Sequence, residues 1–90
     1  MLLWVLGLTH RVRAARSPRR RLIDRLVAAR KAAGLTQVVL AGKLAKPQHF
    51  VSRYEVGDRR LDIVEYVYVA RALDVDPVAE VALCAPTKSV

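Results

Sequence analysis

From Pro18 onward, apolar residues recur at three- and four-residue steps, which is the spacing of an α-helix that buries one face. Short joints rich in glycine, proline and aspartate interrupt this pattern. No stretch alternates between apolar and polar residues for long enough to predict a strand, so the expected fold class is all-α. The pattern predicts five helices, which begin at Pro18, Gln37, Gln48, Ile63 and Pro77 and end near Gly34, Leu44, Val56, Leu73 and Cys84.

Residues that favour helix ends mark the predicted boundaries. Thr36, Asp62 and Asp76 each precede a helical stretch, where a short polar side chain can cap free backbone N–H groups. Pro77 suits a first helical position because its missing N–H costs nothing there. Gly34 follows the first stretch and is predicted to end it in the left-handed conformation.

The inward faces of these stretches define an expected hydrophobic core. A chain of 90 residues is expected to form one domain, which spans residues 18–84. Val64 is expected on the inward side of the fourth helix. The other residues expected to be buried are Leu26, Leu40, Ala41, Leu44, Val51, Tyr54, Val67, Ala70 and Leu73.

The two ends of the chain are expected to lie outside this domain. Residues 1–17 begin with the apolar run Met1–Leu8 and continue into arginine-rich sequence, and we expect a disordered or extended tail. The run is far shorter than the ~20 residues that span a bilayer. Its arginines follow it, whereas a secretory signal has its positive charge in front. A transit peptide stays open as an alternative, and residues 85–90 are expected to fray.

Positive charge is concentrated in the first third of the chain. Residues 1–34 hold nine Lys or Arg and one Asp, whereas residues 35–90 hold seven basic and seven acidic residues, so the net charge of +8 belongs to the N-terminal part. Such a block favours a polyanion as partner, and nucleic acid before a membrane.

The residue types present argue against several classes of function. Cys84 is the single cysteine, which excludes a disulfide within the chain and suits a reducing, cytoplasmic compartment. Two histidines and one cysteine make a zinc site hard to assemble. The sequence shows no nucleophile–base pair and no phosphate-binding loop, so we expect neither an enzyme nor a cofactor.

The segment from Gln37 to Val56 has the properties of two short helices joined by a tight turn. Ala41 supplies the small contact that two helices need where they cross at about 90–120°. The second helix is then free to enter the major groove of DNA, which is wide enough to admit it. The apolar residues that the two helices would share are Leu40, Leu44, Val51 and Tyr54.

Several motifs recur in a familiar order: ARKAAGLTQ, LAGKL, SRYEVG and then RRLD, ARAL and DP. On these motifs, the stretch from Leu26 to Val78 resembles the Xre/Cro phage-repressor family of helix-turn-helix proteins. The resemblance implies a five-helix DNA-binding domain in a transcriptional regulator, expected to repress by occupying an operator. It also implies a protein of bacterial or phage origin that acts in the cytoplasm, at the nucleoid.

The resemblance also implies which residues meet DNA. In this family the first half of the recognition helix contacts base edges, and those positions are Gln48, His49, Ser52 and Arg53. Their chemistry fits, since Gln can bond adenine twice and Arg can fork onto guanine. Phe50 is open to two interpretations, because it could pack in the core or touch a thymine methyl group; packing is favoured.

Backbone contacts are expected on either side of the recognition helix. Gln37 matches a position that contacts a phosphate in this family, and Arg59 and Arg60 match its backbone-contacting loop. Lys43 and Lys46 could also reach phosphates. The arginine-rich segment either lies along DNA as an arm or forms the solvated start of the first helix; its arginines are Arg11, Arg13, Arg16, Arg19, Arg20 and Arg21.

Two further features follow from the comparison with the family. Arg30 and Glu55 match a pair that bridges the first and third helices, and we assign this pair to structure. Gly42, Val38 and Val39 stand where the family favours acids, which leaves an apolar patch that could bind protein. A protein-interaction module, such as the antitoxin of a toxin–antitoxin pair, therefore stays open as an alternative function.

A homodimer on double-stranded DNA is the expected assembly. One short recognition helix covers only a few base pairs, so two related half-sites about one helical turn apart would supply the missing specificity. The dimer contact is expected on the fourth and fifth helices, around Tyr66, Tyr68 and Val81.

Overall fold

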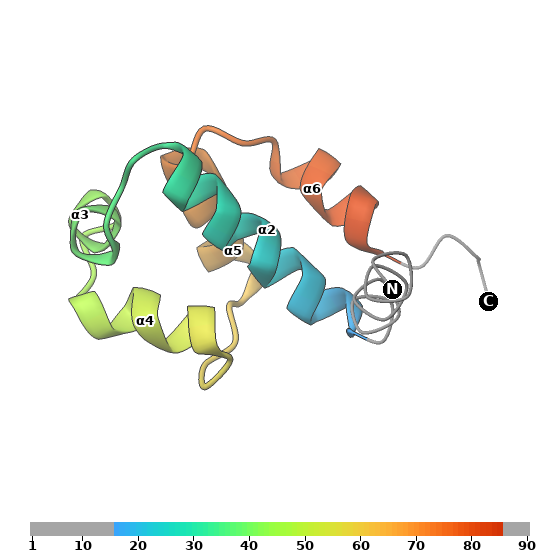
Figure 1. Cartoon of the computed structure of the whole chain (residues 1–90), viewed down its shortest axis with the longest axis horizontal. Helices are drawn as coiled ribbons and strands as arrows, with labels where there is room; N and C mark the ends of the chain where they lie inside the picture. Colours follow the sequence, from blue (N-terminus) through green and yellow to red (C-terminus); the bar gives the residue numbers. More distant parts are fainter. Residues whose placement is uncertain (1–15, 86–90) are drawn as a thin grey trace, which may run out of the picture.

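A computed structural model of the chain describes residues 16–85. Within that range the protein consists of helices and has no strand, which confirms the all-α fold class. The helices are α2 (Pro18–Ala32), α3 (Gln37–Lys43), α4 (Gln48–Val56), α5 (Ile63–Ala72) and α6 (Pro77–Cys84), labelled as in Figure 1. The expectations for the N-terminal tail and for the last residues fall almost entirely outside the described part.

Polar caps set the helix starts, as the sequence predicts. Thr36 Oγ1 accepts the N–H of Val39 at 3.1 Å. Asp62 and Glu65 form a reciprocal capping box at the start of α5. Ser17, an additional cap that was not among the predicted ones, accepts the N–H of Arg20 at 3.0 Å through its hydroxyl oxygen. These bonds satisfy backbone donors that a first helical turn leaves without partners.

The turns between helices use the left-handed conformation. Gly34 has φ 73° and Gly57 has φ 94°, which are ordinary angles for glycine. Ala45, in the turn between α3 and α4, also has a positive φ of 54°. That position costs a residue with a Cβ about 1 kcal/mol. Leu44 and Leu73 cap α3 and α5, so these two helices end one residue earlier than predicted.

The core largely matches the predicted set. Most of the predicted residues are buried, and Phe50 is buried with them, which supports packing as its role. Leu44 and Val67 are half-buried at the edge of the core. Val64 is exposed, so its predicted inward position was wrong. Because nearly every residue of α5 is apolar, the spacing alone does not fix which face turns inward. Tyr66, Val69 and Ala70 are its buried residues, and Leu73, which caps it, is buried too.

The helices form a compact arrangement in which α2 is central. In Figure 1, α3 and α4 lie together at one end, and α6 runs along α2 on the other side. The turn after α3 is tied down by backbone bonds from Ala45 to Gly42 at 3.1 Å and from Lys46 to Ala41 at 3.0 Å. This tight joint fixes α4 against α3 and leaves the outer side of α4 uncovered. No helix between residues 16 and 85 has the length and apolar character needed to cross a bilayer.

Candidate DNA-binding surface

Helix α4 has one buried face and one face in solvent. Phe50, Val51 and Tyr54 point into the core, and Phe50 and Tyr54 meet edge to face with ring centroids 5.7 Å apart. The opposite side carries the four residues expected to contact bases. Gln48, His49 and Arg53 are exposed and Ser52 is half-buried. Since positions one helical turn apart share a face, the structure brings these four side chains together: Gln48, His49, Ser52 and Arg53.

The polar groups on this face are available for an external partner. Ser52 Oγ donates to the carbonyl of His49 at 3.2 Å, and its lone pairs stay open. Between residues 16 and 85, the side chains of Gln48, His49 and Arg53 form no hydrogen bond or ion pair. The face thus presents donors and acceptors on a helix whose other side is held rigidly.

Glu55 holds α4 in place from its buried side. Its carboxylate accepts two bonds from Arg30, from Nε at 2.7 Å and from Nη2 at 3.1 Å. It also accepts from Gln37 Nε2 at 2.8 Å. The backbone carbonyl of Glu55 accepts from Arg20 Nη2 at 2.8 Å. Helices α2, α3 and α4 therefore meet at one carboxylate.

Arg30 and Glu55 are thus the pair that the resemblance implied. Both residues are buried, and the hydrogen bonds that Arg30 donates to Glu55 raise the pKa of Arg30 above its ordinary value. The contacts of Gln37 and Arg20 with Glu55 were not predicted. Both contacts join residues far apart in the sequence, so a pattern of neighbouring residues could not predict them.

Arg59 and Arg60, which the sequence treats alike, have different surroundings. Arg59 forms a two-point ion pair with Glu65, at 2.9 Å through Nη1 and 2.7 Å through Nη2. Its guanidinium also lies 4.7 Å from the centre of the Phe50 ring. Arg60 is exposed and its side chain bonds to nothing within residues 16–85. The structure therefore ties Arg59 to the domain and leaves Arg60 open to solvent.

The ion pair with Arg59 makes the stability of the domain sensitive to acid. The Arg59 hydrogen bonds, and then the backbone N–H of Asp62, lower the pKa of Glu65 from 4.5 to about 2. Because this pKa is lower in the folded state, the contribution of Glu65 is complete above about pH 4.5 and is lost as the pH falls toward 2. We expect Glu65→Gln to lower the midpoint of thermal unfolding near neutral pH, and the gap from wild type to narrow below about pH 4. Thermal scans at several pH values measure this gap; a constant gap would contradict the assignment.

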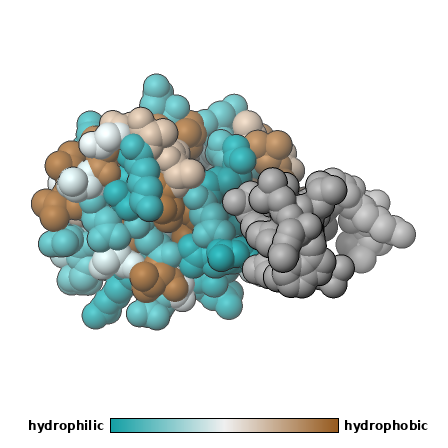
Figure 2. All heavy atoms as spheres, in the orientation of Figure 1, coloured by the Kyte–Doolittle hydropathy of each residue, from teal (hydrophilic) through white to brown (hydrophobic). Residues whose placement is uncertain are grey.

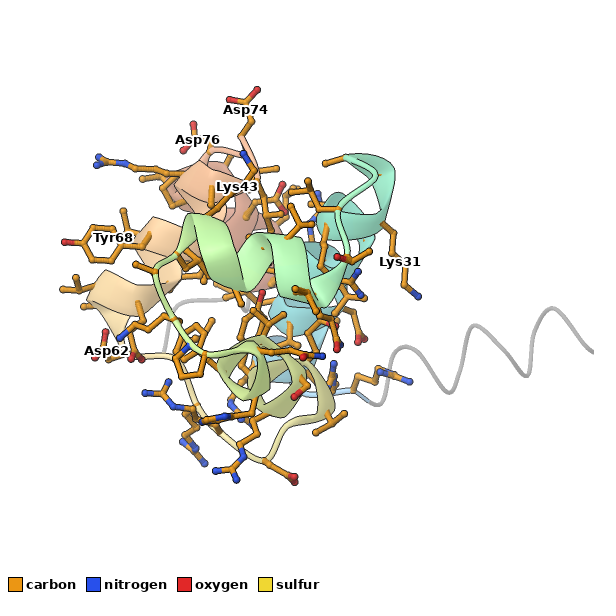
Figure 3. All side chains as sticks on the ribbon, turned by 90° about the vertical axis from the view of Figure 1, so that its left-hand side faces the viewer. Lys31, Lys43, Asp62, Tyr68, Asp74 and Asp76 are labelled. Atoms are coloured by element: carbon orange, nitrogen blue, oxygen red, sulfur yellow. The ribbon has the colours of Figure 1, made fainter. Side chains whose placement is uncertain are left out.

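The other predicted phosphate-binding residues are not all on the α4 side. Lys46 lies in the turn before α4, with Nζ 5.5 Å from the centre of the Phe50 ring. Gln37 uses one N–H of its amide nitrogen on Glu55 and retains a second. Lys43 differs, since Figure 3 draws it on the edge of α3 that turns away from α4 toward Asp74. Gln37 and Lys46 thus lie next to α4, through contacts with residues on its buried side, and Lys43 lies apart from it.

The arginine-rich segment is only partly described. Residues 18–21 belong to α2 and not to a free arm. Arg16 and Arg20 pair with Asp24 at 2.7 Å and 3.0 Å. Arg21 donates to the carbonyl of Cys84 at 2.9 Å. Arg11 and Arg13 lie outside the described residues. Of the segment's four described arginines, only Arg19 is exposed and without such a contact in residues 16–85.

The residues expected at the dimer contact do not form one surface. Tyr66 is buried and its hydroxyl donates to the carbonyl of Pro77 at 2.6 Å, so it offers little outer surface, although it lines the same hollow as Val81. Tyr68 and Val81 are exposed, but they border different hollows of the domain. The sequence does not show this difference, because α5 carries apolar residues on both its buried and its exposed side.

Two other features bear on function. Val38 and Val39 on α3 are exposed, and Figure 2 shows apolar patches on the side where Figure 1 places α3. Within residues 16–85, no three His, Cys, Asp or Glu side chains come together as a metal site would require. The described surface thus offers a polar helix face and apolar patches.

The fold and the open face of α4 define a helix-turn-helix domain. No protein-family model matches the chain, and no curated protein matches it. Among solved structures, the chain is similar to an "XRE-family like protein" from Pseudomonas syringae pv. tomato str. DC3000, with 38% sequence identity and a TM-score of 0.72. The match covers 87% of this chain and 93% of that protein. The chain belongs to the XRE family.

Proposed function

We propose that this protein is a transcriptional regulator that reads DNA sequence through α4 and represses by occupying an operator. One observation carries the proposal: α4 buries one side in the core and holds four unengaged or half-engaged polar side chains on the other. An α-helix fits the major groove, where each base pair presents a distinct set of donors and acceptors. Membership of the XRE family supports DNA binding as the coarser function. The regulator would act at the bacterial or phage nucleoid.

Each side chain on this face has a stated chemistry. Arg53 can donate two parallel bonds to guanine O6 and N7, and Gln48 can bond adenine N6 and N7. His49 and Ser52 can each donate or accept, so they adapt to more than one base. A binding site rich in guanine and adenine on the contacted strand follows from this composition.

Phosphate contacts flank the reading face in this proposal. Arg60 and Lys46 offer exposed positive charge, and Gln37 offers its second amide N–H. Arg59 would contribute less than Arg60, because its guanidinium already satisfies Glu65. Arg11 and Arg13 stay candidates for an arm along the DNA.

Selection from a random DNA library tests the proposal directly. Rounds of binding and amplification should enrich a short motif, and purified protein should bind that motif about 10³-fold or more tighter than unrelated duplex. Equal affinity for the enriched motif and for unrelated duplex would contradict sequence-specific recognition.

We further propose that the protein binds DNA as a homodimer. The enriched motif should contain two inverted half-sites whose centres lie about one helical turn apart. Light scattering of the complex should then give two chains per duplex. A single chain per duplex, on a motif without two-fold symmetry, would rule the dimer out.

A second candidate function rests on the exposed valines of α3. Val38 and Val39 leave apolar surface in water at the start of a helix, as a protein-binding antitoxin would. In that case a Val38→Glu variant would lose a protein partner in a pull-down and wild-type protein would enrich no DNA motif.

A further inference from the structure

An apolar groove runs between α2, α5 and α6. It encloses about 540 Å³, a size that accommodates several large side chains. Arg19, Arg60 and Asp62 stand at its lining among otherwise mostly apolar side chains. The apolar residues that form it include Leu22, Ile23, Ile63, Val67, Val78 and Val81.

The groove leaves unusual amounts of aliphatic surface in water. Ile63 is 78% exposed and Val78 is 76% exposed, and they lie at the first turns of two different helices. Exposed apolar groups that cluster around a hollow are costly in water and commonly mark a place where something binds. An apolar segment would fit the aliphatic part of the groove best.

The chain itself contains a segment of that kind. Every residue of Met1–Leu8 is apolar apart from Gly7, and the run has no charged side chain. The groove opens beside the first turns of α2, since Arg19 and Leu22 line it. Residues 9–15 connect the run to the described domain and can span roughly 23–25 Å when extended. The apolar run is therefore within reach of the groove.

We propose that Met1–Leu8 docks in this groove of the same chain, with Trp4 as its main anchor. A tethered segment reaches its site at an effective concentration near millimolar, which favours it over a second copy of the protein in dilute solution. Large aromatic side chains bury the most apolar area for the rotational freedom they lose. Docking in this groove involves no residue of α4; Arg60, a proposed phosphate contact, lies at the rim that the groove shares with the DNA-binding side.

Trp4 is the only tryptophan in the chain, so its fluorescence reports on this segment alone. In the full chain we expect Trp4 emission to be shifted to the blue of free N-acetyl-tryptophanamide and to be protected from acrylamide quenching. Both properties should be the same across a wide dilution series, because docking within one chain does not depend on concentration.

Two valines at equivalent helix positions provide a variant and its control. Val78 and Val38 are the second residues of α6 and α3, and both are exposed. Glutamate is tolerated at this position because it faces the positive end of the helix dipole. Val78→Glu places a charge in the groove and should remove the blue shift and most of the protection from quenching. Val38→Glu lies outside the groove and should change neither.

Each other outcome would overturn the proposal. An unprotected Trp4 in wild-type protein would show that the segment is not docked. Protection that survives in Val78→Glu would place the segment elsewhere, and protection that disappears on dilution would identify a second copy as the occupant. Circular dichroism checks that each variant is helical. If Val78→Glu failed to fold, Ile63→Glu at the first position of α5 would make the same test.

Discussion

Replacing Glu55 with alanine is expected to destabilise the domain by about 3–5 kcal/mol, because it leaves the buried guanidinium of Arg30 without its counter-charge. Arg30 would keep a single bond to the carbonyl of Leu35, at 2.8 Å, and Gln37 would lose its partner as well. Domains of this size are stable by only about 5–15 kcal/mol in total. Each 1 kcal/mol shifts the unfolding midpoint by roughly 4–8 °C, so thermal scans should show a fall of at least roughly 12 °C.

A surface ion pair and a double variant serve as controls for Glu55. Asp24→Ala removes the partly exposed pairs with Arg16 and Arg20 and should cost less than about 1 kcal/mol. The double variant Arg30→Met/Glu55→Met should be more stable than Glu55→Met alone, because it leaves no buried charge without a partner. Equal losses in the single and double variants would show that the charge of Arg30 is not the source of the effect.

Leu40→Ala is expected to cost about 2–5 kcal/mol, which is the usual range for emptying a fully buried leucine site. Leu40 has no exposed surface and lies where α3 packs on α4. Helix α3 is short and contains Gly42, so it depends on this packing and not on its own propensity. The same variant should therefore also weaken DNA binding, since α3 fixes the position of α4.

Leu83→Ala is the matched control for Leu40. Leu83 is 65% exposed on α6, so the same change of side chain should alter the free energy of unfolding by no more than about 0.5 kcal/mol. Urea titrations of the two variants measure the difference. Similar losses in both would contradict the burial pattern of the core.

The parts of the fold that follow local chemistry could be predicted from the sequence. The N-caps at Thr36, Asp62 and Asp76 and the left-handed Gly34 depend on neighbours in sequence, and all of them are confirmed. On the inward side predicted for α5, Ala70 and Leu73 are buried, whereas Val64 is exposed and the buried residues Tyr66 and Val69 were not predicted there. In a helix that is apolar all round, only the packing of the whole domain decides which face is buried.

The outward face of α4 could also be predicted from the sequence, but the partners of the residues around α4 could not. The alternation of Phe50, Val51 and Tyr54 with polar residues fixes which side chains point outward. Within the described residues, Arg59 has an ion-pair partner and Arg60 does not, because the fold places Glu65 of α5 next to the Arg59 side chain. Sequence patterns identify residue types at a site, and the structure shows which of them already have partners.

If α4 reads sequence and its flanks supply affinity, Arg53→Ala and Arg60→Ala should weaken DNA binding in different ways. Each variant would be titrated on the selected site and on unrelated duplex at several salt concentrations. Arg53→Ala should cost about 1–3 kcal/mol on the selected site and little on unrelated duplex. Arg60→Ala should weaken both complexes alike and reduce the slope of log affinity against log salt by about one. If Arg53→Ala weakened both complexes equally and changed the salt slope as Arg60→Ala does, α4 would not be the reading helix.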